Sequence, residues 1–492
     1  MAFIEQEQVL KVLLGFNPWW ITGGLPKEIN KPVKRVAFYE IKRTISHPKL
    51  RRIVFLSGAR RVGKTTLMYQ VISELLEDEA PAKTILYLSF DHPVLKFFNI
   101  GQIIELFLNN IVNEQDKELY IFFDEIQYAK DWDTWLKILY DQNPGYRIMV
   151  TGSATPIISS KGIESGVGRW ITIKIPTLSF YEYIDLIQIP DKPSLPSGIK
   201  PMSLHQLSKR DLNAIMLKLT GLQKYFHRYL LLGGFPELVM SNDTAFAQRI
   251  LREDVVDKVL KRDITALFGT RNVLDLEKIF LYLCIHSGSI IVRDIISREL
   301  QISRQTIDNY FSILEQSNLI YISNPIEIGG KKVLKSKPKI YVADAALRNA
   351  VLVLGENVLS DTDEMGTIIE TSVYKHIVTF YYSILPRIGY YRDAKKDKEV
   401  DVVVKLPKDK KILVEVKYRT DTGLNRDEAI VNLADQEDTI GAVLVTKRAE
   451  DYGFVSVSTK TPIVKIPAFA YLYLLGHAER ELRSGIPLQH GD

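Results

Sequence analysis

The stretch RRIVFLSGARRVGKTTLMYQVISELL, residues 51–76, decides the fold of the first part of this 492-residue chain. It contains an apolar run at 53–56, then the pattern Gly-x-x-x-x-Gly-Lys-Thr, then a run with helical periodicity. A strand, a glycine-rich turn and a helix in this order predict a P-loop, whose backbone N–H groups and helix N-terminus bind phosphate. The residues expected to bind the nucleotide here are Gly58, Ala59, Arg60, Arg61, Val62, Gly63, Lys64, Thr65 and Thr66.

Two side chains of this pattern have specific expected roles. Lys64 is expected to contact the β and γ phosphates and to act in catalysis, and the hydroxyl of Thr65 is expected to hold Mg²⁺. A chance occurrence of the pattern is disfavoured because the strand and the helix stand on either side of it. ATP and Mg²⁺ are therefore the predicted cofactors.

A second apolar run, LYIFFDEIQ at 119–127, includes two acids after its apolar residues. Asp124 is expected to contact Mg²⁺, directly or through water, from the end of a strand beside the P-loop strand. Glu125, the next residue, is expected to polarise the attacking water as a general base. The two acids together favour ATP hydrolysis over binding alone.

Further candidates lie at and after the end of a third apolar run, YRIMVTGSA at 146–154. If this strand neighbours the P-loop strand, Thr151 and Ser153 lie near the γ-phosphate; otherwise they are turn-forming hydroxyls. Arg169 could stabilise phosphate charge in its own subunit or in a neighbouring subunit of a homo-oligomer, or it could form a surface salt bridge. Strands that alternate with helices predict an α/β fold with a parallel sheet.

Composition limits what the rest of the chain can be. Its length predicts three or four domains, and 46% hydrophobic with 25% charged residues indicates a soluble globular protein. The net charge of +5 leaves any nucleic-acid contact to local basic patches. The single cysteine, Cys284, excludes an intrachain disulfide framework and fits the cytoplasm. No apolar run approaches the length of about 18 residues that a membrane span needs, so no membrane contact is expected. Trp19 and Trp20 are expected to pack against the first domain rather than to stack on adenine.

The middle of the chain is expected to contain a winged helix. Residues 186–210 are proline-rich, which is typical of a connector, and helical patterns follow at 211–272. Residues 273–345 predict two helices and then a hairpin that turns at Gly329-Gly330. The side chains expected to meet DNA are Arg304, Gln305, Asp308 and Asn309 on the second helix, and Lys331, Lys332, Lys335, Lys337 and Lys339 on the hairpin. The alternative is a packing module with solvated lysines.

In the last part of the chain, EVDVVVKLPKDKKILVEVKYR at 399–419 predicts two strands joined by a turn. If the strands pair antiparallel, Asp401 and Glu415 converge and form a hard oxygen site for Mg²⁺ or Mn²⁺. Lys417 would orient or help deprotonate a water for attack on a phosphodiester, and Glu370 on the preceding helix would complete the metal ligands. The alternative is a charged hairpin with a solvated face.

Short motifs spread over nearly the whole chain are GARRVGKTTLM, FFDEIQ, VTGSA, GRW, LSFYEY, GGFPE, KSKPKIYVADAAL and EVDVVV with VEVK. With these motifs the chain resembles prokaryotic AAA+-like ATPases that carry a C-terminal domain of unknown function with a restriction-endonuclease-like fold. Asp401, Glu415 and Lys417 are similar to the PD-(D/E)xK nuclease motif, with valine in place of the usual proline. One departure is PTLSF, where the family usually has proline directly before Leu-Ser-Phe.

The patterns and the resemblance together predict a multidomain α/β protein: a P-loop NTPase of the AAA+/ASCE type, a helical lid, a winged helix and a restriction-endonuclease-like domain. The predicted function is ATP hydrolysis, with the nucleotide state controlling DNA handling or Mg²⁺-dependent cleavage. The alternative is a regulatory ATPase switch of the STAND type, whose nuclease-like fold binds a partner and cuts nothing. The expected boundaries are 1–50 for an N-terminal helical segment, 51–185 for the ATPase core, 186–210 for the connector, 211–272 for the lid, 273–345 for the winged helix and 346–492 for the nuclease-like domain.

Overall fold

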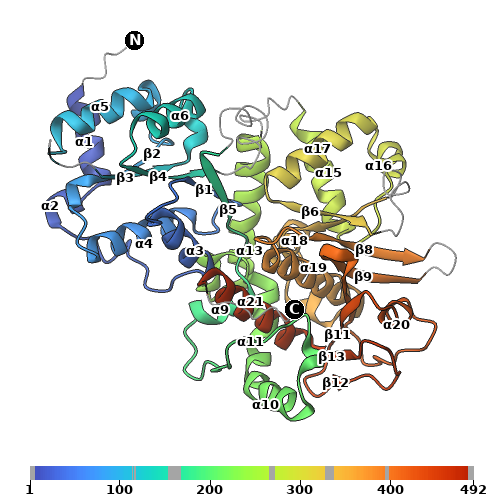
Figure 1. The fold of residues 1–492 in the computed structure, drawn as a ribbon. Coiled ribbons are helices and arrows are strands. Elements are labelled where there is room, and N and C mark those ends of the chain that lie inside the picture. Colours follow the sequence, from blue (N-terminus) through green and yellow to red (C-terminus); the bar gives the residue numbers. More distant parts are fainter. Residues whose placement is uncertain are drawn as a thin grey trace. The chain divides into compact units, whose positions relative to one another are not determined.

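The structure, a computed structural model, describes residues 6–113, 115, 118–152, 168–264, 272–326, 337–393 and 398–485. The chain divides into two compact units, Met1–Pro176 and Thr177–Asp492, and each contains one large β-sheet (Figure 1). No helix among the described residues is both long enough and apolar enough to cross a membrane.

A five-stranded parallel sheet forms the centre of the first unit. The helices and strands of this unit are α1 (Gln6–Phe16), α2 (Trp19–Thr22), α3 (Val36–Ile45), β1 (Ile53–Ser57), α4 (Lys64–Glu77), β2 (Ile85–Ser89), α5 (Ile100–Asn110), β3 (Leu119–Asp124), α6 (Trp132–Gln142), β4 (Tyr146–Gly152) and β5 (Trp170–Lys174). The strand order is β2-β3-β4-β1-β5, and every neighbouring pair is parallel. Figure 1 shows α5 and α6 on one face of the sheet and α3 and α4 on the other. The sheet confirms the predicted α/β fold of a P-loop NTPase.

The place of β4 in the sheet confirms one expectation and corrects another. β4 pairs with β1 on one side and with β3 on the other. The strand that carries Thr151 is therefore a neighbour of the P-loop strand, as predicted. The prediction that the strand of Asp124 lies directly beside the P-loop strand is wrong, because β4 lies between them. Every residue of β1 is buried, which explains why this central strand is a continuous apolar run.

The N-terminal residues cover the edge of this sheet at β2. The side-chain amide of Asn17 donates to the carbonyl of Tyr87 at 2.8 Å and accepts from its N–H at 2.6 Å. The indole N–H groups of Trp19 and Trp20 donate to the carbonyl of Ile85 at 3.0 and 2.8 Å. These contacts satisfy backbone groups that an edge strand would otherwise leave open. They also confirm that the two tryptophans pack against the unit.

A mixed eight-stranded sheet forms the centre of the second unit, with the order β12-β13-β11-β10-β9-β8-β6-β7. Its strands are β6 (Ile320–Pro325), β7 (Lys339–Val342), β8 (Arg387–Asp393), β9 (Lys398–Lys405), β10 (Lys411–Lys417), β11 (Thr439–Thr446), β12 (Gly453–Phe454) and β13 (Ile463–Pro467). Its helices are α9 (Phe180–Leu186), α10 (Lys209–Leu219), α11 (Gln223–Leu232), α12 (Pro236–Val239), α13 (Thr244–Arg252), a π-helix (Glu253–Asp263), α15 (Val273–Ile285), α16 (Arg293–Leu300), α17 (Arg304–Gln316), α18 (Ala345–Leu352), α19 (Thr362–Phe380), α20 (Ala429–Ala434) and α21 (Ala468–Arg483).

Strands of the predicted winged helix and strands of the predicted nuclease-like domain belong to this one sheet. β6 pairs antiparallel with β7 and parallel with β8, with Asn324 opposite Gly389. The expected boundary between residues 345 and 346 therefore separates strands that share backbone hydrogen bonds. The tip of the hairpin, with Gly329, Gly330, Lys331, Lys332 and Lys335, lies outside the described residues.

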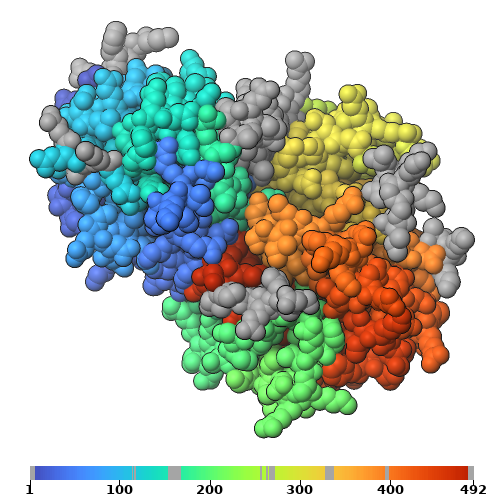
Figure 2. Space-filling view, viewed as in Figure 1, coloured from blue at the N-terminus to red at the C-terminus, as the bar shows by residue number. Residues whose placement is uncertain are grey.

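Helices α19 and α21 form much of the core of the second unit. They pack against each other, and α21 also packs against α9. Most residues of α21 are buried, and little of its dark-red surface is visible in Figure 2. The aromatic residues of α9 join this core, where Phe180 lies 5.1 Å from Tyr229 and Tyr181 lies 5.2 Å from Tyr473 between ring centroids. The motif LSFYEY is thus a packing motif of the second unit.

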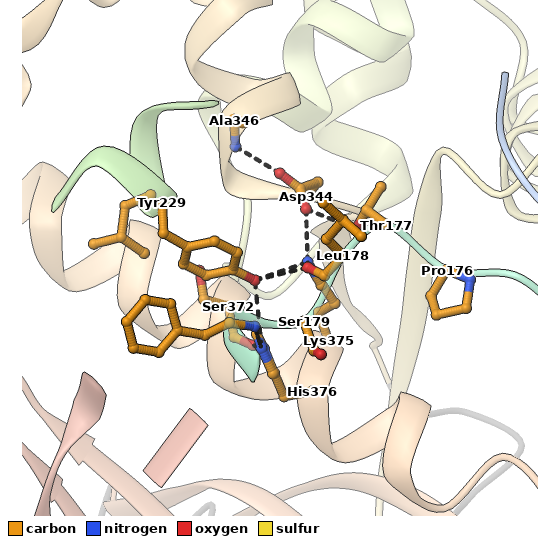
Figure 3. A network of polar contacts seen from close by, with 12 residues as sticks. Pro176, Thr177, Leu178, Ser179, Tyr229, Asp344, Ala346, Ser372, Lys375 and His376 are labelled. Atoms are coloured by element: carbon orange, nitrogen blue, oxygen red, sulfur yellow. Dashed lines mark hydrogen bonds and ion pairs between the residues drawn. The ribbon is translucent and has the colours of Figure 1, made fainter. Parts of the chain in front are cut away.

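A buried lysine–aspartate pair joins the start of the second unit to two of its helices (Figure 3). One carboxylate oxygen of Asp344 caps α18 by accepting the N–H of Ala346 at 2.9 Å. The other accepts from Oγ1 of Thr177 at 2.6 Å and from Nζ of Lys375 at 2.7 Å. Lys375 also donates to the carbonyl of Leu178 at 2.7 Å. Because both buried charges are paired and hydrogen-bonded, the cost of removing them from water is offset.

His376, the next residue of α19, extends this network. Its Nδ1 lies 2.6 Å from the carbonyl oxygen of Ser372 and must donate there, so Nε2 is the acceptor for the N–H of Phe180 at 3.0 Å. Burial, with the charge of Lys375 adding to it, lowers the pKa of His376 to about 3. The imidazole is therefore neutral, and it fixes the first turn of α9 against α19.

Candidate functional site

The P-loop lies between the end of β1 and the start of α4. Gly63, the last loop residue, has a φ of 91°, a left-handed conformation that glycine adopts without strain. At Gly58 a Cβ atom would lie 2.3 Å from the carbonyl oxygen of Ile175, so a larger residue would push the loop away from the residue after β5. Arg35 ties the same region together, since its Nη1 donates to the carbonyls of Val62 at 2.7 Å and Pro176 at 2.9 Å. The loop is thus held closely by its neighbours.

Lys64 begins α4 and is buried. Its Nζ donates to the carbonyls of Gly58 and Ala59, both at 2.9 Å. These bonds hold the ammonium group within the loop, where a phosphate would be bound. Lys64 therefore joins the first two residues of the predicted loop to the start of α4.

Asp124, the last residue of β3, contacts the first turn of α4, the middle of β2 and the end of β4. Its Oδ2 accepts from the hydroxyl of Thr65 at 2.6 Å and from that of Tyr87 at 3.0 Å, and its Oδ1 accepts from the hydroxyl of Thr151. Thr65 and Asp124 present the hard oxygen atoms that Mg²⁺ prefers, so this pair fits the metal of a nucleotide complex. Tyr87 was not predicted, because nothing in the apolar run around it singles it out.

Glu125 follows Asp124 at a turn with a φ of 51°. Its N–H donates to Oγ1 of Thr151 at 2.9 Å, and its carboxylate accepts from the side-chain amide of Gln127. Burial raises the pKa of Glu125, and the charge of Asp124 adds to this, while Lys64 opposes it. A carboxylate with a raised pKa accepts a proton more readily, which suits a general base.

Arg169 does not belong to this site within the chain. It forms an ion pair with Asp141 at the end of α6, with Nε 2.9 Å from Oδ1, and this pair raises the pKa of Arg169. Its carbonyl accepts the N–H of Ile53, the first residue of β1, whereas the P-loop follows the last residue of that strand. Of the alternatives for Arg169, the structure therefore shows the surface salt bridge, and a role towards a neighbouring subunit stays a prediction. Ser153 lies outside the described residues.

The second candidate site lies at β9 and β10, which pair antiparallel as predicted. Val402 lies opposite Val414, and continuing this register by one residue brings Asp401 opposite Glu415. Burial raises the pKa of Asp401 to about 7, with the charge of Glu370 adding to it, and burial raises that of Glu415 well above its usual range. The predicted carboxylates therefore share one buried region.

Metal binding by these carboxylates is not what the structure describes. Among the described residues, no three His, Cys, Asp or Glu side chains are grouped so that they could hold a metal ion. Lys339 lies among the acids instead, with Nζ 3.2 Å from Glu370, 3.1 Å from Glu399 and 3.6 Å from Asp401. Two of the predicted ligands, Glu370 and Asp401, are thus paired with a lysine, and Glu399 completes the set of acids around it.

Other predicted contacts of the second unit also differ. Lys417 donates to Oε1 of Glu428 at 3.1 Å and to the carbonyl of Gly423 at 3.3 Å, so it is directed to the start of α20. Lys339 is only 2% exposed, so the prediction that it contacts DNA is wrong, because its ammonium group is paired with acids inside the unit. Lys337 is exposed, as expected.

The predicted recognition helix is α17. Its Arg304 forms an ion pair with Asp294 of α16, and its Asp308 forms one with Arg293 of the same helix. Gln305 and Asn309 are exposed on α17. The charged side chains of this face are therefore engaged with the neighbouring helix.

Comparison with protein families defines the class. Residues 50–184 match a family model described as "AAA domain". The match agrees with the parallel sheet and the P-loop of the first unit, so residues 50–184 are similar to an AAA domain. Residues 223–358 match "Domain of unknown function (DUF8612)", and residues 365–468 match "Domain of unknown function (DUF4143)".

Individual relatives cover most of the chain. An uncharacterized protein of Haemophilus influenzae is 23% identical over 78% of this chain and 86% of its own length. An uncharacterized protein of Methanocaldococcus jannaschii is 23% identical over 85% of this chain and 87% of its own length. Among solved structures, the Aeropyrum pernix ORC1 protein in complex with DNA is 12% identical over 68% of this chain and 96% of that chain, with a TM-score of 0.30. The Aeropyrum pernix ORC2 protein is 12% identical over 67% of this chain and 97% of that chain, with a TM-score of 0.28.

Proposed function

We propose that the first unit binds ATP with Mg²⁺ and hydrolyses it. The observation that carries this proposal is the 2.6 Å hydrogen bond between Thr65 and Asp124. It connects α4, the helix that follows the P-loop, to the acidic end of β3. Thr65 and Asp124 would hold Mg²⁺, which neutralises phosphate charge when it is bound. Lys64 and the loop N–H groups would bind the β and γ phosphates.

Glu125 would act as the general base. Its backbone is fixed by the hydrogen bond to Thr151, and its carboxylate lies at the same strand end as Asp124. In this position it would accept a proton from a water that attacks the γ-phosphate. A raised pKa supports this role, because proton transfer is most effective when the pKa of the base approaches the working pH.

Phosphate release by the purified full chain tests this proposal. Wild type should release phosphate from ATP in the presence of Mg²⁺. Lys64→Ala should lose nucleotide binding and turnover, whereas Glu125→Gln should keep binding and lose turnover by about 10²–10⁴-fold. A wild-type protein that binds ATP without hydrolysing it, or a Glu125→Gln variant that turns over at the wild-type rate, would contradict it.

For the second unit we propose DNA contact through the region predicted as a winged helix, controlled by the nucleotide state of the first unit. Exposed Gln305 and Asn309 on α17, with exposed Lys337, support this contact. Binding to duplex DNA should weaken steeply with salt if lysines contact phosphates. A protein that shows no binding at low salt, with and without ATP, would contradict DNA contact.

The two functions considered for the second unit, a nuclease and a regulatory switch, differ in whether DNA is cut. A nuclease would need Mg²⁺ or Mn²⁺ beside Asp401 and Glu415, whereas a regulatory ATPase switch would use the nuclease-like fold to bind a partner. The ion pairs of Lys339 favour the switch, because the acids already have a cation. Incubation of DNA with the full chain, ATP and Mg²⁺ or Mn²⁺ should then leave it intact. Cleavage that Asp401→Ala abolishes would show that the second unit is a nuclease.

The single cysteine, Cys284, fits a site of action in the reducing cytoplasm.

A further inference from the structure

Several carboxylates meet around one buried lysine in the second unit. Lys339 is the first residue of β7, and its side chain is 3% exposed. Its Nζ lies 3.1 Å from Oε1 of Glu399, 3.2 Å from Oε1 of Glu370 and 3.6 Å from Oδ1 of Asp401. Glu370 is on α19, whereas Glu399 and Asp401 are on β9. Two elements, α19 and β9, thus converge on the ammonium group that β7 carries.

Further donors orient two of these acids. The hydroxyl of Tyr341 donates to Oε1 of Glu370 at 2.7 Å, and the N–H of Val416 donates to Oδ2 of Asp401 at 2.8 Å. The carboxylates of Glu370 and Asp401 are therefore held in place beside Lys339. The three acids lie 3.1 to 3.6 Å from Nζ, and these are the distances of ion pairs with an ammonium group. A bound divalent ion would need oxygen atoms at roughly 2.0–2.6 Å.

We infer that Lys339 is the resident cation of this carboxylate cluster and that it excludes a divalent metal ion. A second cation beside a buried ammonium group would be repelled strongly, because the surroundings screen charge poorly. The buried carboxylate of Asp401, with two partly buried glutamates beside it, would be costly without any cation, and Lys339 already supplies one. The inference does not depend on ATP hydrolysis by the first unit.

Glu415 indicates what removal of the lysine would create. Its Oε2 atom is buried and has no hydrogen-bond partner in the described part of the chain. The lysine of the nuclease-like motif, Lys417, is bonded to Glu428 and does not supply one. Without the Lys339 ammonium group, Glu370, Asp401 and Glu415 would offer hard oxygen ligands to Mn²⁺ or Mg²⁺. Among the described residues no three such acids are grouped to hold a metal ion as they stand, so a site would form only if Lys339 were removed and the acids closed on the ion.

Mn²⁺ binding to the nucleotide-free full chain tests this inference. Free Mn²⁺ is measured by electron paramagnetic resonance during titration of wild type, Lys339→Met and Lys337→Met. Lys337 is the matched control, since it loses the same charge two residues away at an exposed position. We expect Lys339→Met alone to gain one Mn²⁺ per chain, bound at least about tenfold more tightly than any Mn²⁺ on wild type. The double variant Lys339→Met/Asp401→Asn should lose this gain.

Three results would overturn the inference. The first is a Lys339→Met variant that folds and gains no Mn²⁺. The second is a wild-type protein that binds one Mn²⁺ which Asp401→Asn removes, because a metal would then bind beside Lys339. The third is a Lys339→Met variant that does not fold even with Mn²⁺, because the cluster then has no such site. If Lys339→Met folds only when Mn²⁺ is added, the metal replaces the lost cation as inferred.

Discussion

Replacing Gly58 with alanine should disturb the P-loop without changing any of its polar groups. The added Cβ would lie 2.3 Å from the carbonyl oxygen of Ile175 and 3.1 Å from Cγ2 of Val62, where ordinary contacts begin at 3.4 Å. The obstacle is backbone and cannot rotate away, because the N–H of Ile175 donates to the carbonyl of Ser57 at 2.7 Å. The loop must therefore move by about 1 Å.

This movement sets the size of the effect. Forcing one carbon atom into a packed region costs about 1–3 kcal/mol. For a unit of this size, roughly 2–4 °C of melting temperature corresponds to each kcal/mol, so the melting temperature should fall by about 2–12 °C. A displacement of about 1 Å in groups that position a substrate can lower turnover by about 10²-fold. ATP turnover should therefore be largely lost, whereas the melting temperature should fall by only a few degrees.

The assay compares Gly58→Ala with Gly24→Ala in the same unit. A Cβ at Gly24 meets nothing within 4 Å, so this control carries the same chemical change without the overlap. Melting temperature and steady-state phosphate release are measured for both variants and wild type. The reasoning is refuted if Gly58→Ala keeps wild-type stability and turnover, or if both variants lose equal amounts.

Three further changes have defined outcomes. Arg169→Ala breaks the exposed pair with Asp141 and should leave ATP turnover per chain at low concentration within about twofold of wild type; a loss of more than about tenfold would restore a catalytic role. The pKa of His376 is about 3 in the folded state, below the value of about 6.5 in the unfolded chain. The stability that His376 contributes is therefore complete above about pH 6.5. Below that pH, the free energy of unfolding falls by about 1.4 kcal/mol for each pH unit. His376→Gln should flatten the pH dependence of the urea midpoint between pH 6.5 and 5, and an unchanged dependence would contradict this. Asn17→Ala leaves two backbone groups of Tyr87 without partners and should cost about 1–3 kcal/mol for each group that stays buried; an unchanged melting temperature of the first unit would show that the edge of β2 does not need Asn17.

The P-loop and the acids of β3 could be predicted because the residues of each motif are adjacent in the sequence. Residues 58–66 must follow one another for the loop to curl around phosphate, and Asp124 and Glu125 mark the end of a strand by themselves. The strand order was not accessible in the same way, since nothing local says that β4 lies between β1 and β3. Tyr87 was missed for the same reason, because it reaches Asp124 only through the pairing of β2 with β3.

At the second site, sequence patterns could not predict which lysine is buried among the acids. Lys339 belongs to a lysine-rich hairpin and has the same side-chain parity as Lys337, so periodicity cannot separate a buried lysine from an exposed one. Its burial depends on three elements, α19, β7 and β9, that are far apart in the sequence. The antiparallel pairing of β9 and β10 was predicted correctly, yet the identity of the cation among the acids required the tertiary structure.

The claim that Lys64 and Glu125 hydrolyse ATP is tested most directly by a single-turnover experiment with ATP labelled in its α-phosphate. The protein is present in excess over the nucleotide, and Mg²⁺ is added. The bound label is then separated into ATP and ADP at successive times. Wild type should convert the bound label to ADP, whereas Glu125→Gln should bind as much label and hold it as ATP. A wild-type protein that retains only ATP, or a Glu125→Gln protein that forms ADP at the wild-type rate, would contradict the proposed site.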